Sequence, residues 1–318
     1  MKIKFLDAAT LGDDLICEIP KLFGNLGEVI IRSSTMPHKI EAAIADSDVI
    51  IVNKLKLNAS NLKSAGSLKL ICETATGFDN IDTEYCKAAN IAVCNVNAYS
   101  AESVAQLTLA IALTLVCHMP QYYDYVKSGA YSKSGTANML TPVYYELSGK
   151  TWGIAGAGNI GRRVAKIARA MGCRVIVNKL HPVSDMECVD IDTLCKTSDI
   201  ISVHTPLTSK TRNLINRDRI AMMKPNAIFI NVSRGGVADE AALTEAIEQK
   251  RLGGLGIDVY TEEPFSETHP YNRILSYPNT CFTPHNAWGA YESRLRCLSA
   301  TADNIKAYLR GESTNRVV

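Results

Sequence analysis

A glycine cluster near the middle of the chain sets the strongest constraint on its fold. The run Gly156-Ala-Gly-Asn-Ile-Gly161 follows the apolar residues 152–155 and opens a segment, 162–171, with a helical pattern. In the order strand, turn, helix, the first glycine permits the turn, the second lets the backbone approach a pyrophosphate, and the third lets helix pack on strand. The amides and positive dipole end of the helix would bind the phosphates.

The predicted dinucleotide-contacting residues of this turn are Gly156, Gly158, Asn159, Ile160 and Gly161. The alternative interpretation is a small-residue turn in an ordinary α/β domain. Because about half of the chain precedes the motif, those residues must form a separate fold, and 318 residues suit two domains of roughly 150 residues.

Composition excludes several classes of protein. Hydrophobic residues make up 47% and charged residues 21%, which is typical of a globular protein, and a net charge of +2 gives no basic footprint for nucleic acid. No apolar run is long enough to span a membrane. The ten cysteines lie scattered without a C-x-x-C pair, which favours a reducing cytoplasm, and clustered Cys and His that would predict a metal site are absent.

Alternating strand and helix patterns predict an α/β fold on both sides of the segment 101–150. Before it, strand patterns lie at 3–6, 29–32, 49–52, 68–72 and 91–95, with helical stretches such as 36–45 and 83–89 between them. After it, strand patterns lie at 152–155, 175–177, 200–203, 227–232, 254–259 and 280–282, with a helix at 240–249. These predict two Rossmann-like, doubly wound parallel sheets, the second of about six strands.

The remaining segments suggest how the domains are connected. A helical pattern from about residue 101 to 126 is apolar on more than one face, which is typical of a helix buried on several sides, including against another subunit. The weakly patterned stretch 127–148 is either a dimer arm or a loop over the active site. The last helical pattern, 290–310, follows the second sheet, and we expect it to pack on the first domain.

We therefore expect a discontinuous domain of residues 1–98 plus 290–318 with a flavodoxin-like sheet. A dinucleotide-binding Rossmann domain, residues 99–289, would be inserted into it and would carry a dimerisation helix and arm at 101–150.

Three titratable or charged residues follow strand ends in the second domain, where ligands of open α/β sheets bind. They are Arg234, Glu263 and His285, each of which alone is equally an ordinary surface or loop residue. Together they fit the reduction of a 2-keto acid. After hydride transfer from a nicotinamide, the substrate oxygen needs a proton, which histidine supplies near neutral pH. A carboxylate orients that histidine, and a guanidinium binds the carboxylate and polarises the carbonyl of the substrate.

Over nearly its whole length the chain resembles the D-isomer-specific 2-hydroxyacid dehydrogenases. The matching segments are 75–82, 104–106, 156–161, 204–207, 231–235, 258–264 and 284–285, with Gln106 where many members have Glu. The resemblance implies that Arg234 binds the substrate, that His285 is the acid/base, and that Glu263, rather than the adjacent Glu262, is its partner.

The same resemblance implies the other contacts and a homodimer. Asp258 would hold the nicotinamide amide, and the backbone amides of Thr76 and Gly77 would hold the substrate carboxylate. The implied cofactor contacts also include His204, Pro206, Val232 and Ser233.

Two segments resemble the glycerate dehydrogenase, or hydroxypyruvate reductase, branch of the family: Asn53-Lys54 and His285-Asn-Ala-Trp288. Lys54 either approaches an anionic substrate or is a solvated loop lysine, and Trp288 either lines the cleft or is a core aromatic. We expect reduction of hydroxypyruvate or glyoxylate to the D-hydroxy acid. The alternatives are a D-lactate-type dehydrogenase, a phosphoglycerate-type enzyme, disfavoured because no regulatory domain follows Val318, and a non-catalytic, dinucleotide-sensing protein like a corepressor.

The strand after the glycine helix leaves the choice between NAD and NADP open. An acid is expected at its end to bind the ribose hydroxyls of NAD, but this chain has Asn178 and then Lys179. A lysine attracts a 2′-phosphate, and His181 is near, which favours NADP. In the alternative, Lys179 points to solvent and Asn178 serves NAD.

Overall fold

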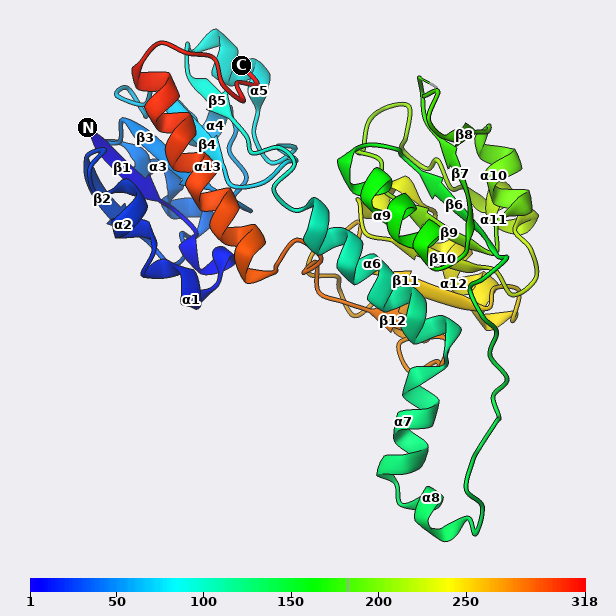
Figure 1. Cartoon of the computed structure of the whole chain (residues 1–318). Coiled ribbons are helices and arrows are strands. Elements are labelled where there is room, and N and C mark those ends of the chain that lie inside the picture. Colours follow the sequence, from blue (N-terminus) through cyan, green and yellow to red (C-terminus); the bar gives the residue numbers. More distant parts are fainter. Residues whose placement is uncertain (182) are drawn as a thin grey trace. The chain divides into compact units, whose positions relative to one another are not determined.

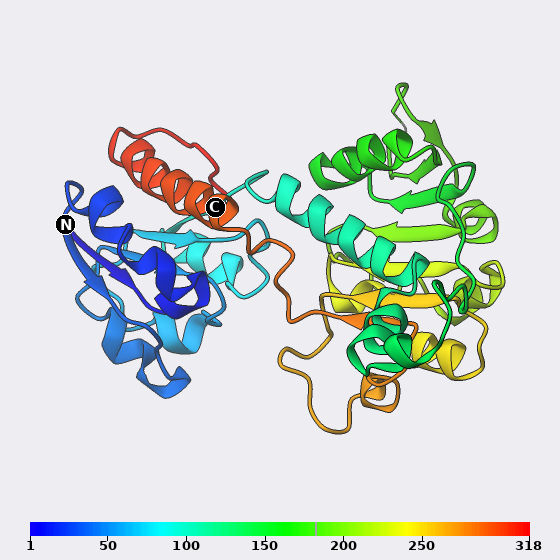
Figure 2. The same cartoon turned by 60° about the horizontal axis from the view of Figure 1, so that its bottom comes forward.

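Two parallel β-sheets form the framework of the chain in the computed structural model, which describes residues 1–181 and 183–318. The chain divides into one unit of residues 1–100 with 289–318 (unit 1) and a second of residues 101–288 (unit 2). In both units helices pack on the faces of the sheet (Figures 1 and 2). The predicted α/β class is thus confirmed.

The sheet of unit 1 has the strand order β2-β1-β3-β4-β5, which is the flavodoxin-like order. Its strands are β1 (Lys2–Phe5), β2 (Glu28–Ile31), β3 (Val49–Val52), β4 (Leu70–Glu73) and β5 (Ala92–Cys94). All neighbours pair in parallel. Every residue of β3 is buried, as expected for a parallel strand that is covered on both faces.

The helices of unit 1 are α1 (Asp13–Ile16), α2 (Ile19–Phe23), α3 (Ile40–Ile44), α4 (Ala59–Leu62), α5 (Thr83–Ala88) and α13 (Tyr291–Leu309). The predicted helix at 36–45 is shorter than expected, because Pro37–Lys39 form a separate 3₁₀ turn before α3. The last helix, α13, contacts α1, α2 and β4, and it buries Cys297, Leu298 and Ile305.

The sheet of unit 2 has the order β12-β11-β10-β9-β6-β7-β8, seven strands among the described residues. They are β6 (Thr151–Ala155), β7 (Arg174–Asn178), β8 (Glu187–Cys188), β9 (Ile200–Val203), β10 (Ile228–Asn231), β11 (Gly254–Ile257) and β12 (Thr280–Phe282). The two residues of β8 are too few to give a sequence pattern. Because β6 pairs with both β7 and β9, the strand order reverses there, and the carboxyl ends of β6 and β9 flank the switch point.

Seven helices accompany this sheet in the described part of unit 2: α6 (Ala101–Val116), α7 (Met119–Lys127), α8 (Ala130–Lys133), α9 (Asn159–Ala170), α10 (Ile191–Thr197), α11 (Arg217–Met222) and α12 (Glu240–Glu248). Residues of α6 and α9 share one buried apolar cluster with Trp152, and residues of α10, α11 and α12 share another with Phe229. The sheet is therefore packed on both faces.

The single helix predicted from about residue 101 to 126 is wrong. The structure has two helices, α6 and α7, with a 66° bend between them. His118 adopts a left-handed conformation (φ 49°), and Pro120 has no N–H to continue the hydrogen-bond ladder of α6. Neither of these helices, nor any other described helix, is long and apolar enough by itself to cross a membrane. Only α6 and α7 taken together, as a bent pair, have a sufficient length and apolar composition.

The residues after α6 project from the rest of unit 2 (Figure 1). We call residues 117–148 the arm; it contains α7, α8 and a stretch without regular structure. Its exposed large apolar side chains are Met119, Tyr123, Val126, Tyr131, Met139, Leu140, Val143, Tyr144 and Tyr145.

Candidate functional site

The three glycines of the turn after β6 differ in what surrounds them. Gly156 has φ +104°, and a Cβ there would lie 2.7 Å from the carbonyl carbon of His204. A Cβ at Gly161 would lie 2.0 Å from the carbonyl oxygen of Gly156. At Gly158 a Cβ would meet nothing within 4 Å. The fold itself therefore requires the first and third glycines, whereas the second faces open space.

The turn fits a pyrophosphate. Helix α9 begins at Asn159, and no hydrogen bond from the side chain of a described residue caps its N-terminus. The first amides of a helix need acceptors, and a phosphate supplies them at the positive end of the dipole. The turn also lies at the switch point, because Gly156 follows β6 and packs against His204, which follows β9.

His204 is held in one orientation beneath this turn. Its backbone N–H donates to the Ala155 carbonyl (2.7 Å), and its Nε2 lies 2.9 Å from Ser202 Oγ. Trp152 Nε1 donates to the same Ser202 oxygen (2.9 Å), so we assign the Ser202 hydroxyl as donor to Nε2. Burial lowers the pKa of His204 to about 3, and the ring is neutral.

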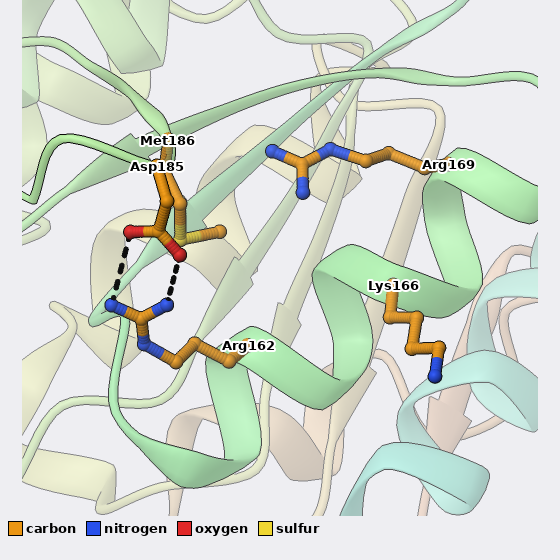
Figure 3. A pocket seen from close by; sticks show the side chains of 5 residues that line it. All are labelled: Arg162, Lys166, Arg169, Asp185 and Met186. Carbon is orange, nitrogen blue, oxygen red and sulfur yellow. Dashed lines mark hydrogen bonds and ion pairs between the residues drawn. The ribbon is translucent and has the colours of Figure 1, made fainter.

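Lys179 follows β7, the position that the sequence predicted for it. Its side chain is half-buried, whereas that of His181 is exposed. The neighbouring Asn178 donates from Nδ2 to the Val189 carbonyl (3.0 Å), so its amide group holds the chain near β8. Asp185, farther along this loop, accepts from both terminal nitrogens of Arg162, in the first turns of α9 (Figure 3).

A basic pocket of about 290 Å³ lies beside this ion pair. It is lined by Arg162, Lys166, Arg169, Asp185 and Met186 (Figure 3). Sequence reasoning did not single it out, although the spacing of its cations on α9 is the i, i+4, i+7 spacing of one helix face.

The charged residues after β10, β11 and β12 lie at the carboxyl ends of three adjacent strands. His285 Nδ1 lies 2.6 Å from Glu263 Oε2, and the two side chains are 21% and 30% exposed. The other oxygen of Glu263 accepts from the Tyr260 N–H (3.0 Å). The predicted histidine–carboxylate pair is thus present, with one face open to solvent.

Asp258 holds the loop that carries His285. Its carboxylate accepts from Thr283 Oγ1 (2.6 Å), the Asn286 N–H (2.9 Å) and the Ala287 N–H (3.0 Å). The Asp258 side chain is fully buried, and burial raises its pKa, whereas these hydrogen bonds favour the charged form.

His285 itself adopts φ 51°, a conformation that is uncommon for residues other than glycine. Trp288 Nε1 donates to the His285 carbonyl (3.0 Å), so both flanks of this residue are fixed. The loop therefore maintains a strained backbone at the histidine.

Arg234 is half-buried, and its Nη1 donates to the carbonyl of Ser233 (2.8 Å). Asn231 fixes this loop, because its Nδ2 donates to the Arg234 carbonyl (2.9 Å) and its Oδ1 accepts from the Ser233 N–H (3.1 Å) and hydroxyl (2.9 Å). Val232 is buried and Pro206 is exposed. Sequence reasoning missed Asn231, Tyr260 and Trp152 as supporting residues, since their contacts come from tertiary structure.

In unit 1, the predicted substrate residues lie at the carboxyl edge of the sheet. Thr76 and Gly77 follow β4, and Thr76 donates from Oγ1 to the Val96 carbonyl (2.9 Å). Lys54 follows β3 with an exposed side chain, and its backbone N–H donates to Asp7 (2.7 Å).

A buried polar cluster lies beneath that edge, which sequence reasoning missed. Asp7 accepts from the backbone N–H groups of residues 53, 54 and 55. Glu73 is fully buried and accepts from Asn80 Nδ2 (3.0 Å), and burial raises its pKa well above the usual range. Within the described residues, Glu73 Oε1 and Asn53 Oδ1 have no hydrogen-bond partner. The only sequence signal was a charged residue at the end of an apolar strand.

Comparison with known proteins places unit 2 in one family. Residues 109–287 match the family described as "D-isomer specific 2-hydroxyacid dehydrogenase, NAD binding domain". The match spans the glycine turn and the residues Arg234, Glu263 and His285.

Two curated relatives and one solved structure are similar over nearly the whole chain. A glycerate dehydrogenase of Methylorubrum extorquens is 33% identical over 90% of this chain and 90% of its own. A hydroxypyruvate reductase of Thermotoga maritima is 35% identical over 90% of this chain and 93% of its own. The structure of an acyclic imino acid reductase (Bsp5) in complex with NADPH and D-Arg superposes with a TM-score of 0.89 at 28% identity, covering 100% of both chains.

Proposed function

The chain belongs to the D-isomer specific 2-hydroxyacid dehydrogenase family, and on that premise we propose that it reduces hydroxypyruvate to the D-hydroxy acid, or glyoxylate to the corresponding achiral hydroxy acid. A member of this family is an oxidoreductase that uses a nicotinamide dinucleotide. The names of the two relatives support a small keto acid with three carbons as the substrate, and glyoxylate is the two-carbon acid of the same class. The contact between His285 and Glu263 at the carboxyl edge of the dinucleotide-binding sheet is the observation that carries the proposal.

His285 supplies the proton of the reaction. When bound, a reduced nicotinamide would supply the hydride for the new C–H bond at the keto carbon. The former carbonyl oxygen then takes a proton, and with Nδ1 of His285 engaged by Glu263, we assign that proton to Nε2. Glu263 favours the protonated ring and fixes its plane. In the reverse direction the same nitrogen accepts the hydroxyl proton.

Arg234 would bind the substrate carboxylate and polarise its carbonyl, since a guanidinium can donate two parallel hydrogen bonds. We assign the backbone amides of Thr76 and Gly77 to the same carboxylate, and Lys54 and Trp288 to the substrate as further contacts. Asp258 stays a prediction as the nicotinamide ligand, although its described hydrogen bonds all go to the loop of His285.

We propose NADP as the preferred dinucleotide. Lys179 follows β7, where the ribose hydroxyls bind in this fold, and a lysine cannot accept their hydrogen bonds but attracts a 2′-phosphate. Asn178, the alternative ribose ligand, uses its amide group to hold the Val189 carbonyl. The solved relative with NADPH shows that proteins of this fold accommodate the phosphorylated form.

We also propose a homodimer that forms through α6 and the arm. The arm exposes a set of tyrosine, valine, leucine and methionine side chains that its own unit does not cover. Exposed apolar patches of this kind mark interaction surfaces, and one copy of the chain offers the same surface to another. Light scattering coupled to gel filtration tests this proposal, with Tyr145→Asp and Leu140→Asp expected to yield monomers.

A cytoplasmic location is our proposal from the cysteines. Six of them are buried, and none of the ten is in a disulfide. Burial raises the pKa of Cys195 to about 12, so that it packs as a neutral thiol in the core. Fractionation of cells that express the tagged protein checks the location.

A panel of keto acids with both dinucleotides tests the function. Initial rates are measured with hydroxypyruvate, glyoxylate, pyruvate and phosphohydroxypyruvate, each with NADH and NADPH, and the chirality of the product is determined. We expect the highest kcat/KM with hydroxypyruvate or glyoxylate and NADPH, and a D-configured product from hydroxypyruvate.

Two results would contradict the proposal. Binding of a reduced dinucleotide without turnover of any keto acid would indicate a dinucleotide-sensing protein. Turnover of keto acids only when an amine is present would indicate an imino acid reductase, the activity named for the solved relative.

A further inference from the structure

The turn that carries Glu263 rests on a buried carboxylate from a different helix. Glu240, the first residue of α12, accepts from the Thr261 N–H (2.9 Å) and also from the Thr261 hydroxyl. Thr261 lies two residues before Glu263. The Glu240 side chain is only 8% exposed, so these contacts are shielded from water. A carboxylate at the N-terminus of a helix is also favoured by the helix dipole.

His269 supplies the third hydrogen bond to this carboxylate, and its protonation state follows from its contacts. Its Nε2 lies 3.0 Å from Glu240 Oε2, and its side chain is 5% exposed. Its Nδ1 accepts from the Tyr271 N–H (3.3 Å), so Nδ1 carries no proton. The ring is therefore the neutral tautomer that donates from Nε2. Glu240 and His269 hold both ends of the segment 261–269.

The same turn touches the loop of Arg234. A Cβ at Gly235 would lie 2.1 Å from the Tyr260 carbonyl carbon and 2.2 Å from the Thr261 nitrogen, so the two backbones are in direct contact. Tyr260 donates its N–H to Glu263 and its hydroxyl to the Thr283 carbonyl, two residues before His285. The turn is thus the element that all three proposed site residues share.

We propose that Glu240 and His269 are positioning residues that hold Glu263 at hydrogen-bond distance from His285. This inference rests on the proposed roles of Glu263 and His285. Without the Glu240 contacts the segment 261–269 loses three hydrogen bonds, two of them in the turn. The carboxylate of Glu263 then spends less time on Nδ1, and the protonated form of His285 is stabilised less. Glu263 and Asp258 are two charged groups that act on His285, and of these two only Glu263 is carried by this turn.

The experiment compares pH profiles of kcat/KM for keto acid reduction in the intact enzyme. Glu263→Gln is the reference, and we expect it to lower the pH above which reduction fails. Glu240→Gln should shift this alkaline limb in the same direction by a smaller amount, with kcat/KM at the optimum reduced on the order of 10- to 100-fold. Glu245→Gln is the matched control on the same helix, because Glu245 pairs with Arg217 at the surface and should leave the profile unchanged.

A pair of His269 variants separates positioning from stability. His269→Gln places an amide donor toward Glu240, whereas His269→Asn keeps an acceptor for the Tyr271 N–H and loses the contact with Glu240. We expect the alkaline limb to shift in His269→Asn and to return toward the wild-type position in His269→Gln, whatever the melting temperatures of the two variants.

Each outcome decides the matter. If Glu263→Gln shifts the limb but Glu240→Gln and His269→Asn only lower the melting temperature, Glu240 and His269 are structural and the inference is overturned. If Glu263→Gln leaves the limb in place, the proposed pairing of Glu263 with His285 fails first, and this inference fails with it. In the double variant Glu240→Gln/Glu263→Gln, a limb at the position of Glu263→Gln alone would support the inference, and a further shift would contradict it.

Discussion

The carboxyl edges of the two sheets are built from similar residues but use them differently. In unit 2, Glu263 and His285 pair with each other and keep part of their surface in solvent. In unit 1, Asp7 and Glu73 are buried, and their described hydrogen bonds go to backbone N–H groups and to Asn80. An edge that performs acid/base chemistry needs titratable groups that ligands reach, whereas an edge that presents backbone amides needs buried hydrogen-bonding groups beneath it that hold the loops.

The contrast identifies which substitutions should affect activity and which should affect folding. Removing one member of a partly exposed pair costs the folded state little stability, because water replaces the lost partner. A buried acceptor is costly to remove, because its donors are left without one.

The largest effect is expected at the edge of unit 2. His285→Ala should reduce kcat/KM by about two to four orders of magnitude, since a positioned general acid contributes roughly that factor. Arg234→Ala should cost a similar factor, while the melting temperatures stay near that of the wild type. Steady-state kinetics and calorimetry check both variants, and near wild-type turnover in either one would refute the assigned role.

The next effect is expected at the edge of unit 1 and in stability. Asp7→Ala removes the acceptor of the N–H groups of residues 53, 54 and 55, and we expect a loss of about 3 kcal/mol in the free energy of unfolding. Urea unfolding measures it. Asp13→Ala, a change at an exposed position of the same unit, serves as the comparison. Equal stabilities of the two variants would show that the buried carboxylate is not what holds these loops.

Glu73 should make the stability of the protein fall as the pH rises. Burial raises the pKa of the folded carboxyl above its ordinary 4.5, so the folded state keeps its proton in a range where the unfolded state has lost it. Stability is therefore lost from about pH 4.5 upward until the folded pKa is passed, by about 1.4 kcal/mol per pH unit.

Glu73→Gln removes that slope, because the amide does not titrate. In urea unfolding, the free energy of unfolding of the variant relative to the wild type should be higher at pH 9 than at pH 6. The free energy of unfolding of Glu84→Gln, a change on the surface of α5, should have the same pH dependence as that of the wild type. A stability difference between Glu73→Gln and wild type that is the same at both pH values would argue against a protonated Glu73.

The smallest effect concerns the choice of dinucleotide in unit 2. Lys179→Ser should raise the KM for NADPH about 10-fold and leave that for NADH nearly unchanged, since only the charged contact to a 2′-phosphate is lost. Lys166→Ser, in the basic pocket on α9, controls for the general positive field of this region. Equal changes in the two variants would place the preference in that field and not in Lys179.

Local patterns were sufficient to predict the described strands other than β8, the glycine turn and the residues that follow the strand ends. The predicted ranges of β3 and β12 coincide with the observed ones, and the geometry of Gly156, Gly158 and Gly161 agrees with the roles expected from their spacing. The pairing of His285 with Glu263 was expected from the resemblance to the family. Local patterns alone do not predict it, because the two residues are 22 positions apart in sequence.

Features that depend on contacts far apart in sequence were not predictable in the same way. The apolar pattern continued past residue 116 and concealed the break before Pro120, although the proline itself was a visible signal. Glu240 and His269 are ordinary residues of a helix and a loop until the fold brings Glu240 into contact with both Thr261 and His269. Glu73 looks like the solvated end of a strand, and only packing on both faces of the sheet encloses it.

The position of α13 has a consequence for the order in which the chain acquires its structure during synthesis. Unit 2 is continuous, and its last strand has left the ribosome once residue 282 has emerged. Unit 1 begins first but finishes last, because the apolar surface that receives Cys297, Leu298 and Ile305 has no cover until the final helix is translated. The part of the N-terminal unit that α13 covers therefore stays exposed throughout the translation of unit 2, and chaperones that recognise apolar segments have that whole interval in which to bind it.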